Sequence, residues 1–425
     1  MSERPFLETF RLRVTPMTPV HVGSGELLEP YAYLLRDGEL WVLDPVALLE
    51  ALPPEAADRY LGALEKGPFR AREALLELAA RHDLGSAVAW RAPVSEDFQA
   101  FVSEALERGR GELGVRVFPR SLRGPCLPGS SLKGALRTVF LFDRSREELA
   151  ADFDEGAFEW EGERDLRYRG RVWQLEAPGS GRIRIPAGAL RGRKALSPNQ
   201  SFEAFLLGNY LEKSNRGTGS KEGKAEISRD PFRTLLVGDS SPLPTTAFSV
   251  VEVHGSRRRP DQGPTGIRIL AETWRKGSVE VDLRIHRGLQ EHPGSALHVR
   301  RDRDGRATPA STHPPSLRAL AVVAYERYVL QAERELDFYE ARGWHRAARE
   351  MERVLDVIEK CLDDEGRMRK PYRFPLRIGF GSGELSFRLS EFVEYENARR
   401  RRVDPASRKL AGGVPMGWVL VEVLE

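Results

Sequence analysis

Strand-like and helix-like segments are interspersed along this chain without a regular strand–helix–strand period. Phe6–Val14 alternates apolar and polar residues, as a half-buried strand does. Residues 317–340 and 347–362 instead place apolar side chains at three- and four-residue steps, which is typical of helices packed along one side. Further strand-like segments lie at residues 31–35, 40–43, 248–253, 279–285, 376–380, 385–389 and 418–423. This irregular mixture predicts an α+β fold with two sheets.

The length of the chain bounds its organisation. A chain of 425 residues is too long for one ordinary core, and we expect two domains, residues 1–250 and 251–425. Asp37-Gly38 separates two short strands and predicts a hairpin turn, while Asp44-Pro45 predicts the cap and first residue of a helix. Residues 55–110 have a charged, helical pattern, so the first domain is expected to carry helical and loop insertions.

The composition describes a globular protein with a heavily charged surface. Hydrophobic residues make up 40% and charged residues 30% of the chain. The sequence contains no apolar run long enough for a membrane span and no signal peptide, and Cys126 and Cys361 are its only thiols. These observations predict a cytoplasmic protein without a membrane partner. No metal-ligand spacing or nucleotide-binding motif is present, so neither a metal nor another cofactor is expected.

The formal net charge is only +3, which excludes a uniformly basic surface. Most of the 66 cationic side chains are nevertheless arginine, whose planar fork suits phosphate recognition. Arginines are concentrated between residues 159 and 194. A GC-rich genome is an alternative explanation for this preference.

Residues 128–137, P-G-S-S-L-K-G-A-L-R, combine a turn, two hydroxyls and helical apolar spacing. Ser130 or Ser131 is expected to cap the helix, and Lys133 and Arg137 share a face of its first turns. Free amides, the positive end of the helix dipole and two cations would together bind a phosphate. An ordinary capped helix with solvated cations is the alternative. The segment does not match a nucleotide-triphosphate loop.

Two glycine-rich turns are further candidates. His21 precedes Gly23-Ser24-Gly25, where the main chain can approach a ligand closely and the imidazole could act as a base or a hydrogen-bond donor. Residues 377–383, R-I-G-F-G-S-G, form either a close-packed hairpin or a backbone nest for a nucleic-acid phosphate. A third segment, D-P-F-R at 230–233, is a turn before a strand, and its spacing alone assigns no role to Arg233.

Five segments occur along the chain in a fixed order: H-V-G-S-G (21–25), L-P-G-S-S-L-K-G-A-L-R (127–137), D-P-F-R…D-S (230–240), R-I-G-F-G-S-G (377–383) and P-M-G-W-V (415–419). This series resembles the RAMP superfamily of CRISPR proteins, and within it the family of fifth subunits of type III-A Csm complexes. The second segment is common to several RAMP subunits, whereas the D-P-F-R element, the chain length and the P-M-G-W ending point to this family.

The resemblance implies two ferredoxin-like (RRM-like) RAMP domains and a non-catalytic, RNA-binding role in a Csm effector complex. Members of the family cap the filament at the 3′ part of the crRNA. The implied partners are crRNA, target RNA, the terminal copy of the backbone subunit and the small filament subunit. The candidate RNA contacts are His21, Gly23, Ser24, Gly25, Ser130, Ser131, Lys133, Arg137, Arg233, Arg377, Gly379, Gly381, Ser382 and Gly383.

A second interpretation remains open. RAMP endoribonucleases process precursor crRNA, and His21 would be the general base of such an enzyme. These enzymes are usually much shorter and usually lack the P-G-S-S-L-K-G helix. The chain also departs from the target-cleaving backbone subunit, because Asp37 and Asp44 lie in a hairpin and a helix cap rather than in that subunit's aspartate loop.

Overall fold

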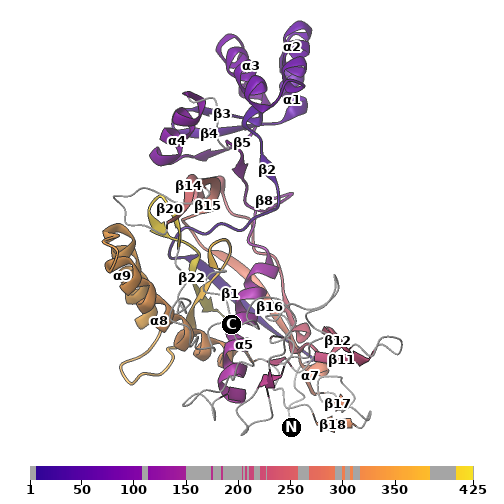
Figure 1. Ribbon diagram of the computed structural model, residues 1–425, viewed down its shortest axis with the longest axis vertical. Helices are drawn as coiled ribbons and strands as arrows, with labels where there is room; N and C mark the ends of the chain where they lie inside the picture. Colours follow the sequence, from indigo (N-terminus) through magenta and orange to yellow (C-terminus); the bar gives the residue numbers. More distant parts are fainter. Residues whose placement is uncertain are drawn as a thin grey trace.

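The computed structural model shows an elongated molecule, with helices α1–α4 (within residues 45–107) at one end and two sheets that follow one another below them along the long axis (Figure 1). It describes residues 6–107, 113–149, 203, 206–207, 210–214, 221–225, 227–256, 268–291, 299–301, 307–309, 316–382 and 408–424, together with two short strands at 174–175 and 183–184. The predicted contact Gly383, the predicted strand 385–389 and most of the arginine-rich segment 159–194 lie outside the described residues.

The central sheet has five antiparallel strands. In spatial order they are β13 (Leu235–Val237), β16 (Val279–His286), β1 (Leu7–Pro16), β22 (Trp418–Val423) and β19 (Arg373–Arg377). Helix α5 (Gly129–Leu149) lies between β1 and β13 in the sequence, and α8 (Leu317–Glu340) lies between β16 and β22. The succession β1-α5-β13-β16-α8-β22, with this strand order, is the ferredoxin-like topology. The predicted α+β fold class is confirmed.

The central sheet crosses the domain boundary expected at residue 250. Val14 of β1 pairs with Val279 of β16 on one side and with Val421 of β22 on the other. The first strand therefore obtains both of its neighbours from the second half of the chain. A division at residue 250 does not separate the sheets, because strand pairing joins distant segments that sequence patterns treat independently.

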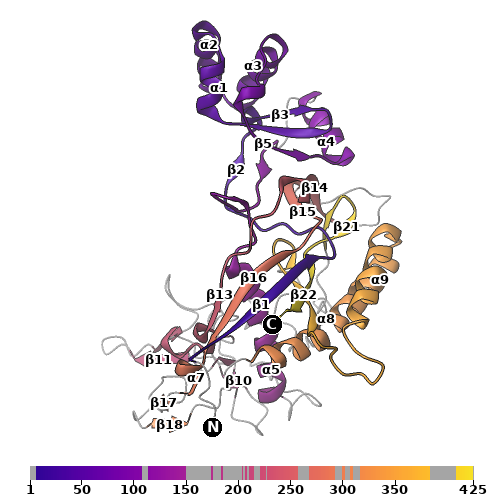
Figure 2. The same cartoon turned by 180° about the vertical axis from the view of Figure 1, so that it is seen from behind.

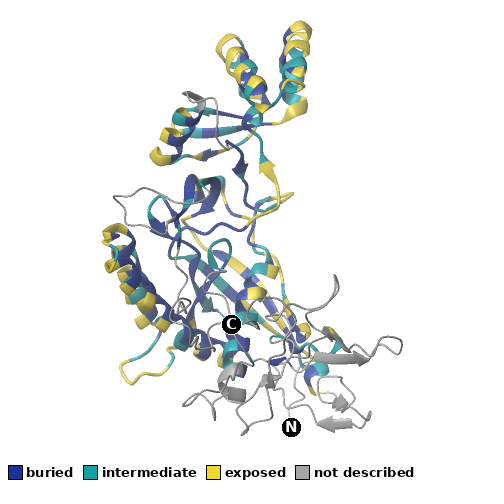
Figure 3. Cartoon of the chain, in the orientation of Figure 1, coloured by how far each residue is buried: buried dark blue, intermediate teal, exposed yellow. Residues whose placement is uncertain are grey.

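One face of the central sheet is buried beneath α5 and α8. Strand β16 alternates strictly, with Val281 and Leu283 buried and Glu280 and Asp282 exposed. The buried side chains pack against the apolar sides of the two helices, whereas the opposite face is more exposed (Figure 3) and carries charged residues. Helix α9 (His345–Glu359) packs beside α8, as seen from both sides of the molecule (Figures 1 and 2).

The upper sheet joins the central sheet to the helical end of the molecule. Its strands, in spatial order, are β2 (Leu27–Leu28), β6 (Val115–Arg116), β15 (Arg268–Trp274), β14 (Phe248–Ser256), β20 (Arg408–Ala411) and β21 (Val414–Pro415). Val250 and Leu270 pack against the helical insertion, while Val251 and Ile269 pack with Met416 on the other side. Because both faces are covered, β15 is an almost continuously buried run.

The helical insertion comprises residues 30–107. It contains β3 (Tyr33–Arg36), β4 (Glu39–Leu43), α1 (Pro45–Ala51), α2 (Pro54–Leu64), α3 (Pro68–Arg81), β5 (Val88–Pro93) and α4 (Glu96–Glu107). The predicted hairpin is confirmed, with positive φ at Asp37 (51°) and Gly38 (75°), and so is the cap, because Asp44 accepts hydrogen bonds from the amides of Val46 and Ala47. The helical interpretation of 55–110 missed β5, which owes its conformation to pairing with β4.

The remaining described elements are short. They are β7 (Arg120–Ser121), β8 (Gly124–Pro125), β9 (Gln174–Leu175), β10 (Ile183–Arg184), β11 (Tyr210–Ser214), β12 (Lys221–Ala225), α7 (Arg287–Glu291), β17 (Val299–Arg301), β18 (Ala307–Pro309) and the 3₁₀ turns η1 (Pro30–Ala32), η2 (Gly85–Ala87), η4 (Ile227–Arg229), η5 (Pro231–Thr234) and η6 (Thr245–Ala247). Among the described helices, none has the length and apolar character required to cross a membrane.

Candidate nucleic-acid interface

The first turn of α5 is braced by the loop after β13. The Leu127 N–H donates to Ser240 Oγ over 2.9 Å, and the Gly129 N–H donates to Asp239 Oδ1 over 2.8 Å. A Cβ on Gly129 would lie 2.4 Å from the carbonyl oxygens of Val237 and Gly238, so only glycine permits this approach. The helix begins at Gly129 and its first amide already binds a carboxylate. The expected serine cap with a free amide for phosphate is therefore wrong at this position.

Ser130 and Ser131 instead lie inside the first turn of α5. Ser130 is exposed and Ser131 is half-buried, and the Ser131 N–H donates to the Pro128 carbonyl over 3.0 Å. The Ser130 hydroxyl therefore remains on the surface as a hydrogen-bonding group beside the cations of the helix.

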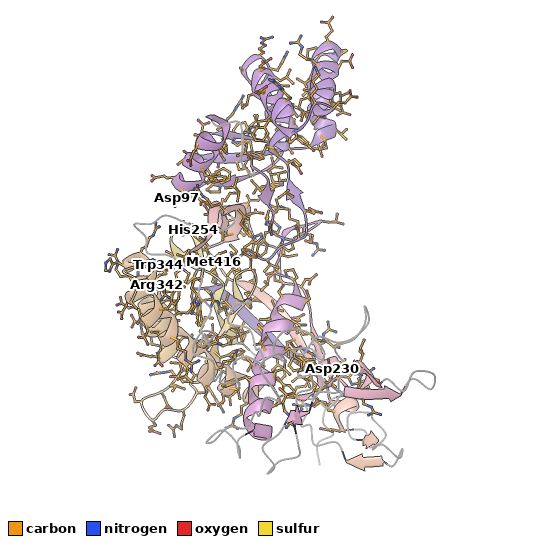
Figure 4. The ribbon with its side chains drawn as sticks, viewed as in Figure 1. Asp97, Asp230, His254, Arg342, Trp344 and Met416 are labelled. Atoms are coloured by element: carbon orange, nitrogen blue, oxygen red, sulfur yellow. The ribbon has the colours of Figure 1, made fainter. Side chains whose placement is uncertain are left out.

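Lys133 and Arg137 of α5 lie beside Asp230, which Figure 4 labels next to that helix. Arg137 Nη1 is 2.5 Å from Asp230 Oδ2, and Asp230 Oδ1 accepts a hydrogen bond from the Phe232 N–H over 2.9 Å. Arg137, one of the two cations predicted to bind phosphate, thus already has a counter-ion within the protein. Lys133 is half-buried, and burial lowers its pKa while the Asp230 charge opposes that shift. Arg233 is exposed and donates to the Ser228 carbonyl.

The two glycine-rich turns lie in contact. The Phe380 N–H donates to the His21 carbonyl oxygen over 2.7 Å. Gly379 has a φ of +76°, and a Cβ there would lie 2.2 Å from the same oxygen. Gly417, in the P-M-G-W-V segment, connects the two turns further. Its N–H donates to the Pro19 carbonyl, and its carbonyl accepts a hydrogen bond from the Ile378 N–H. We refer to residues 21–25 and 379–382 as the paired turns.

The paired turns expose main chain beside two cations. Gly23, Ser24 and Gly25 are exposed, and nothing lies within 4 Å of the position of a Gly25 Cβ. The Ser24 hydroxyl donates to the Val117 carbonyl over 3.1 Å and fixes the first turn on the upper sheet. In the second turn the Ser382 hydroxyl donates to the Gly379 carbonyl over 2.5 Å.

Sequence reasoning missed the two cations that flank the paired turns. The Arg116 guanidinium lies 5.9 Å from the centre of the Phe380 ring. The position of a Gly381 Cβ is 3.1 Å from Lys409 Cβ, and the lysine side chain extends from there to Gly255, where Nζ is 2.9 Å from the position of a Cβ. Both cations come from strands of the upper sheet, β6 and β20. No local pattern distinguishes them from other strand cations, because only sheet pairing brings them to these turns.

The His21 side chain points into the protein. His21 is 1% exposed, its Nδ1 lies 2.8 Å from the Glu272 carbonyl oxygen, and the ring meets Phe380 edge-on. Burial lowers its pKa, which favours a neutral ring with a proton on Nδ1 for the Glu272 carbonyl. The imidazole therefore anchors the turn, and RNA would reach the main chain of this turn rather than the ring.

Arg377 lies in the core, not on the predicted RNA surface. Its Nη1 is 2.6 Å from Glu335 Oε1, and the same carboxylate lies 3.2 Å from Arg408 Nε and accepts a hydrogen bond from the Trp418 indole. Glu335 is fully buried and Arg377 is 4% exposed. The prediction of an RNA contact at Arg377 is therefore corrected to a structural role. A strand pattern cannot reveal that its charge is matched by a glutamate on α8.

The described residues contain no group of three potential metal ligands.

Comparisons with known proteins identify the family of the chain. The family model of the RAMP superfamily matches residues 13–386. The chain belongs to the RAMP superfamily. The resemblance noted in the five sequence segments is thereby confirmed at the level of the superfamily.

Two solved structures have a similar fold along nearly the whole chain. One is a chain of the cryo-EM structure of a Csm–crRNA–target RNA ternary complex of a type III-A CRISPR–Cas system, with 20% identity and a TM-score of 0.60, covering 98% of this chain and 100% of the other. The second is the crystal structure of Csm5 from T. onnurineus, with 19% identity and a TM-score of 0.56, covering 96% and 99%. No curated protein matches this chain.

Proposed function

We propose that this chain is a non-catalytic, RNA-binding subunit of a type III-A CRISPR (Csm) effector complex in the cytoplasm. It caps the filament at the 3′ end of the crRNA and supports crRNA maturation and the binding of target RNA. Its partners are the crRNA, the target RNA, the terminal copy of the backbone subunit and the small filament subunit. Membership of the RAMP superfamily and the full-length likeness to a chain of a Csm–crRNA–target RNA complex support this proposal.

The paired turns are the observation that carries the proposal. Exposed main chain at Gly23–Gly25, with open space around Gly25, lies near a second turn flanked by Arg116 and Lys409. Main-chain amides and cations recognise phosphates without reading bases, which suits a subunit that must hold guides of many sequences. Lys133, Ser130 and Arg233 form a second group of candidate contacts around α5.

The endoribonuclease alternative has less support. A general base must reach the 2′-hydroxyl of the cleaved nucleotide, whereas His21 is 1% exposed and its ring is held by the Glu272 carbonyl. Incubation of the purified chain with repeat RNA in the absence of metal tests this directly. We expect intact RNA, and discrete cleavage that disappears in His21→Ala would overturn the non-catalytic assignment.

Reconstitution with and without this chain tests the proposal. The complex should be assembled from its other subunits and precursor crRNA, and the crRNA 3′ ends should be mapped before and after treatment with a single-strand nuclease. Addition of this chain should protect the 3′ part of the crRNA and leave the 5′ part unaffected. Equal 3′ protection in its absence, or failure of the chain to join the complex, would overturn the proposal.

A further inference from the structure

A cavity of about 800 Å³ opens between α8 and the loop that joins α9 to β19. This loop extends next to α8 at the lower left of Figure 1. Arg318, Val322, Tyr325 and Glu326 recur at three- and four-residue steps along one side of α8 and form one wall. Met368 and Tyr372 are among the loop residues that form the other. The cavity is separate from the paired turns, and its volume is within the range of sites that bind small ligands.

Asp363 organises the wall that the loop forms. The Asp363 Oδ1 accepts hydrogen bonds from the amides of Glu365 and Arg367, and the Arg369 N–H donates to the Cys361 carbonyl over 2.9 Å. Arg367 forms ion pairs with Asp363 and Glu365, and Arg369 with Asp364. The acidic residues of the loop therefore form ion pairs with the arginines of the same loop.

Two further cations that line the cavity form no such ion pairs with described residues. Arg318 and Lys370 are exposed, and neither has an ion-pair or hydrogen-bond partner among the described residues. Arg318 lies in the first turn of α8, whose cap is Ser316, so the positive end of a long helix dipole adds to its charge. The cavity therefore presents two free positive charges on opposite walls.

Between these charges the lining is mixed: aromatic and aliphatic side chains provide most of its surface, and Glu326 and Asp363 add two carboxylates. Tyr325 and Tyr372 are half-buried, Val322 is exposed, and Met368 packs partly against the core. Flat aromatic and aliphatic walls suit the face of a nucleobase, and cations beside them suit its phosphates. A duplex cannot use such a site because its bases are already stacked on one another. An acidic peptide would satisfy the cations but would leave the tyrosine rings without a matching flat surface.

We propose that this cavity binds one or two nucleotides of single-stranded RNA, with a base against the tyrosines and the phosphates at Arg318 and Lys370. The inference rests on the proposed RNA-binding function and adds a second site, on the helix-covered side of the central sheet. Stacking on the tyrosines does not depend on the identity of the base, since every base has a flat face.

Salt dependence of RNA binding by the full-length chain tests the site. The double variant Arg318→Glu/Lys370→Glu removes both free cations, and Arg334→Glu/Lys360→Glu is the matched control, because these exposed residues on α8 and after α9 do not line the cavity. Each lost phosphate contact reduces the log–log salt slope for a single strand by about 0.7, so the double variant should reduce it by about 1.4. The control should keep the slope of the unaltered chain.

Crosslinking locates the RNA independently. A single-stranded RNA containing 4-thiouridine, irradiated with the full-length chain, should crosslink to the peptide that contains Tyr325 or Tyr372, and the crosslink should be lost in the double variant. Crosslinks confined to the paired turns, an unchanged salt slope, or tighter binding of an oligo-glutamate peptide than of RNA at this cavity would overturn the inference while leaving the proposed function intact. Absence of any RNA binding by the unaltered chain and its complex would instead defeat the proposed function itself.

Discussion

The main-chain N–H of Phe380 donates a hydrogen bond of 2.7 Å to the carbonyl oxygen of His21. This bond joins turns from opposite ends of the sequence and sets the spacing of the candidate RNA surface. It forms because β22 pairs with both β1 and β19, which brings the segments that follow β1 and β19 to the same edge of the central sheet. The fold and the candidate site thus have a common origin in these two strand pairings.

Gly379 should be indispensable for this contact. In Gly379→Ala, the positive φ costs roughly 1–2 kcal/mol for a residue with a Cβ, and the added Cβ would also collide with the His21 carbonyl oxygen. We expect a clear fall in melting temperature together with weaker RNA binding. Gly25→Ala is the matched control, because its φ of +87° is similarly strained while no atom lies within 4 Å of the new Cβ. Equal loss of stability in the two variants would contradict the close-contact argument.

The ion pair between Arg137 and Asp230 should contribute to stability. Both side chains are partly exposed, at 30% and 16%, so screening by solvent limits their coupling to about 1 kcal/mol. A double-mutant cycle of Arg137→Ala and Asp230→Asn, measured by urea unfolding, gives this coupling free energy.

Lys133→Ala should leave stability within about 0.5 kcal/mol of the unaltered chain and weaken RNA binding. A large stability loss in Lys133→Ala would show that the lysine is structural.

The buried carboxylate of Glu335 should matter more for folding than any surface charge. Glu335→Gln would leave Arg377 and Arg408 without their shared counter-ion, and breaking a buried pair costs about 3–5 kcal/mol. Urea unfolding should reveal this loss, with the exposed Glu333→Gln on the same helix as a control. If Arg377→Ala remained stable and lost only RNA binding, the original assignment of Arg377 as an RNA contact would be restored.

Local sequence patterns predicted the elements better than the site. The hairpin at Asp37-Gly38, the cap at Asp44 and the bounds of α8 follow from nearby residues, and the structure confirms them. The capping of α5 by Asp239 and the burial of Arg377 beside Glu335 depend on residues far apart in sequence. Such partners cannot be read from spacing, because a strand pattern specifies which face is apolar but not which strand lies next to it.

Burial of His21 should make stability depend on pH. Its folded-state pKa is lowered from the usual value of 6.5, mainly by desolvation, so below that value the unfolded chain binds more protons than the folded one. The stabilisation that depends on the neutral ring is therefore lost as pH falls through 6.5. Melting temperature should decrease less between pH 7.5 and pH 5.5 in His21→Gln than in the unaltered chain, and the exposed His345→Gln should behave like the unaltered chain. The same decrease in all three proteins would mean that His21 does not titrate in this range.

The cations beside the paired turns provide the most direct test of the RNA surface. Arg116 and Lys409 reach these turns from strands of the upper sheet, and each is expected to neutralise one phosphate. In Arg116→Glu/Lys409→Glu, the log–log salt slope for single-stranded RNA should fall by about 1.4, as expected for two lost contacts. The control Arg59→Glu/Lys66→Glu makes the same charge change on exposed residues at the end of the helical insertion, far from the turns (Figure 1). In the assembled complex, nucleases should cut the crRNA 3′ part more readily with the first variant than with the control. Equal protection by two stably folded variants would remove the paired turns from the RNA surface, because a phosphate contact there could not be unaffected by the reversal of the Arg116 and Lys409 charges.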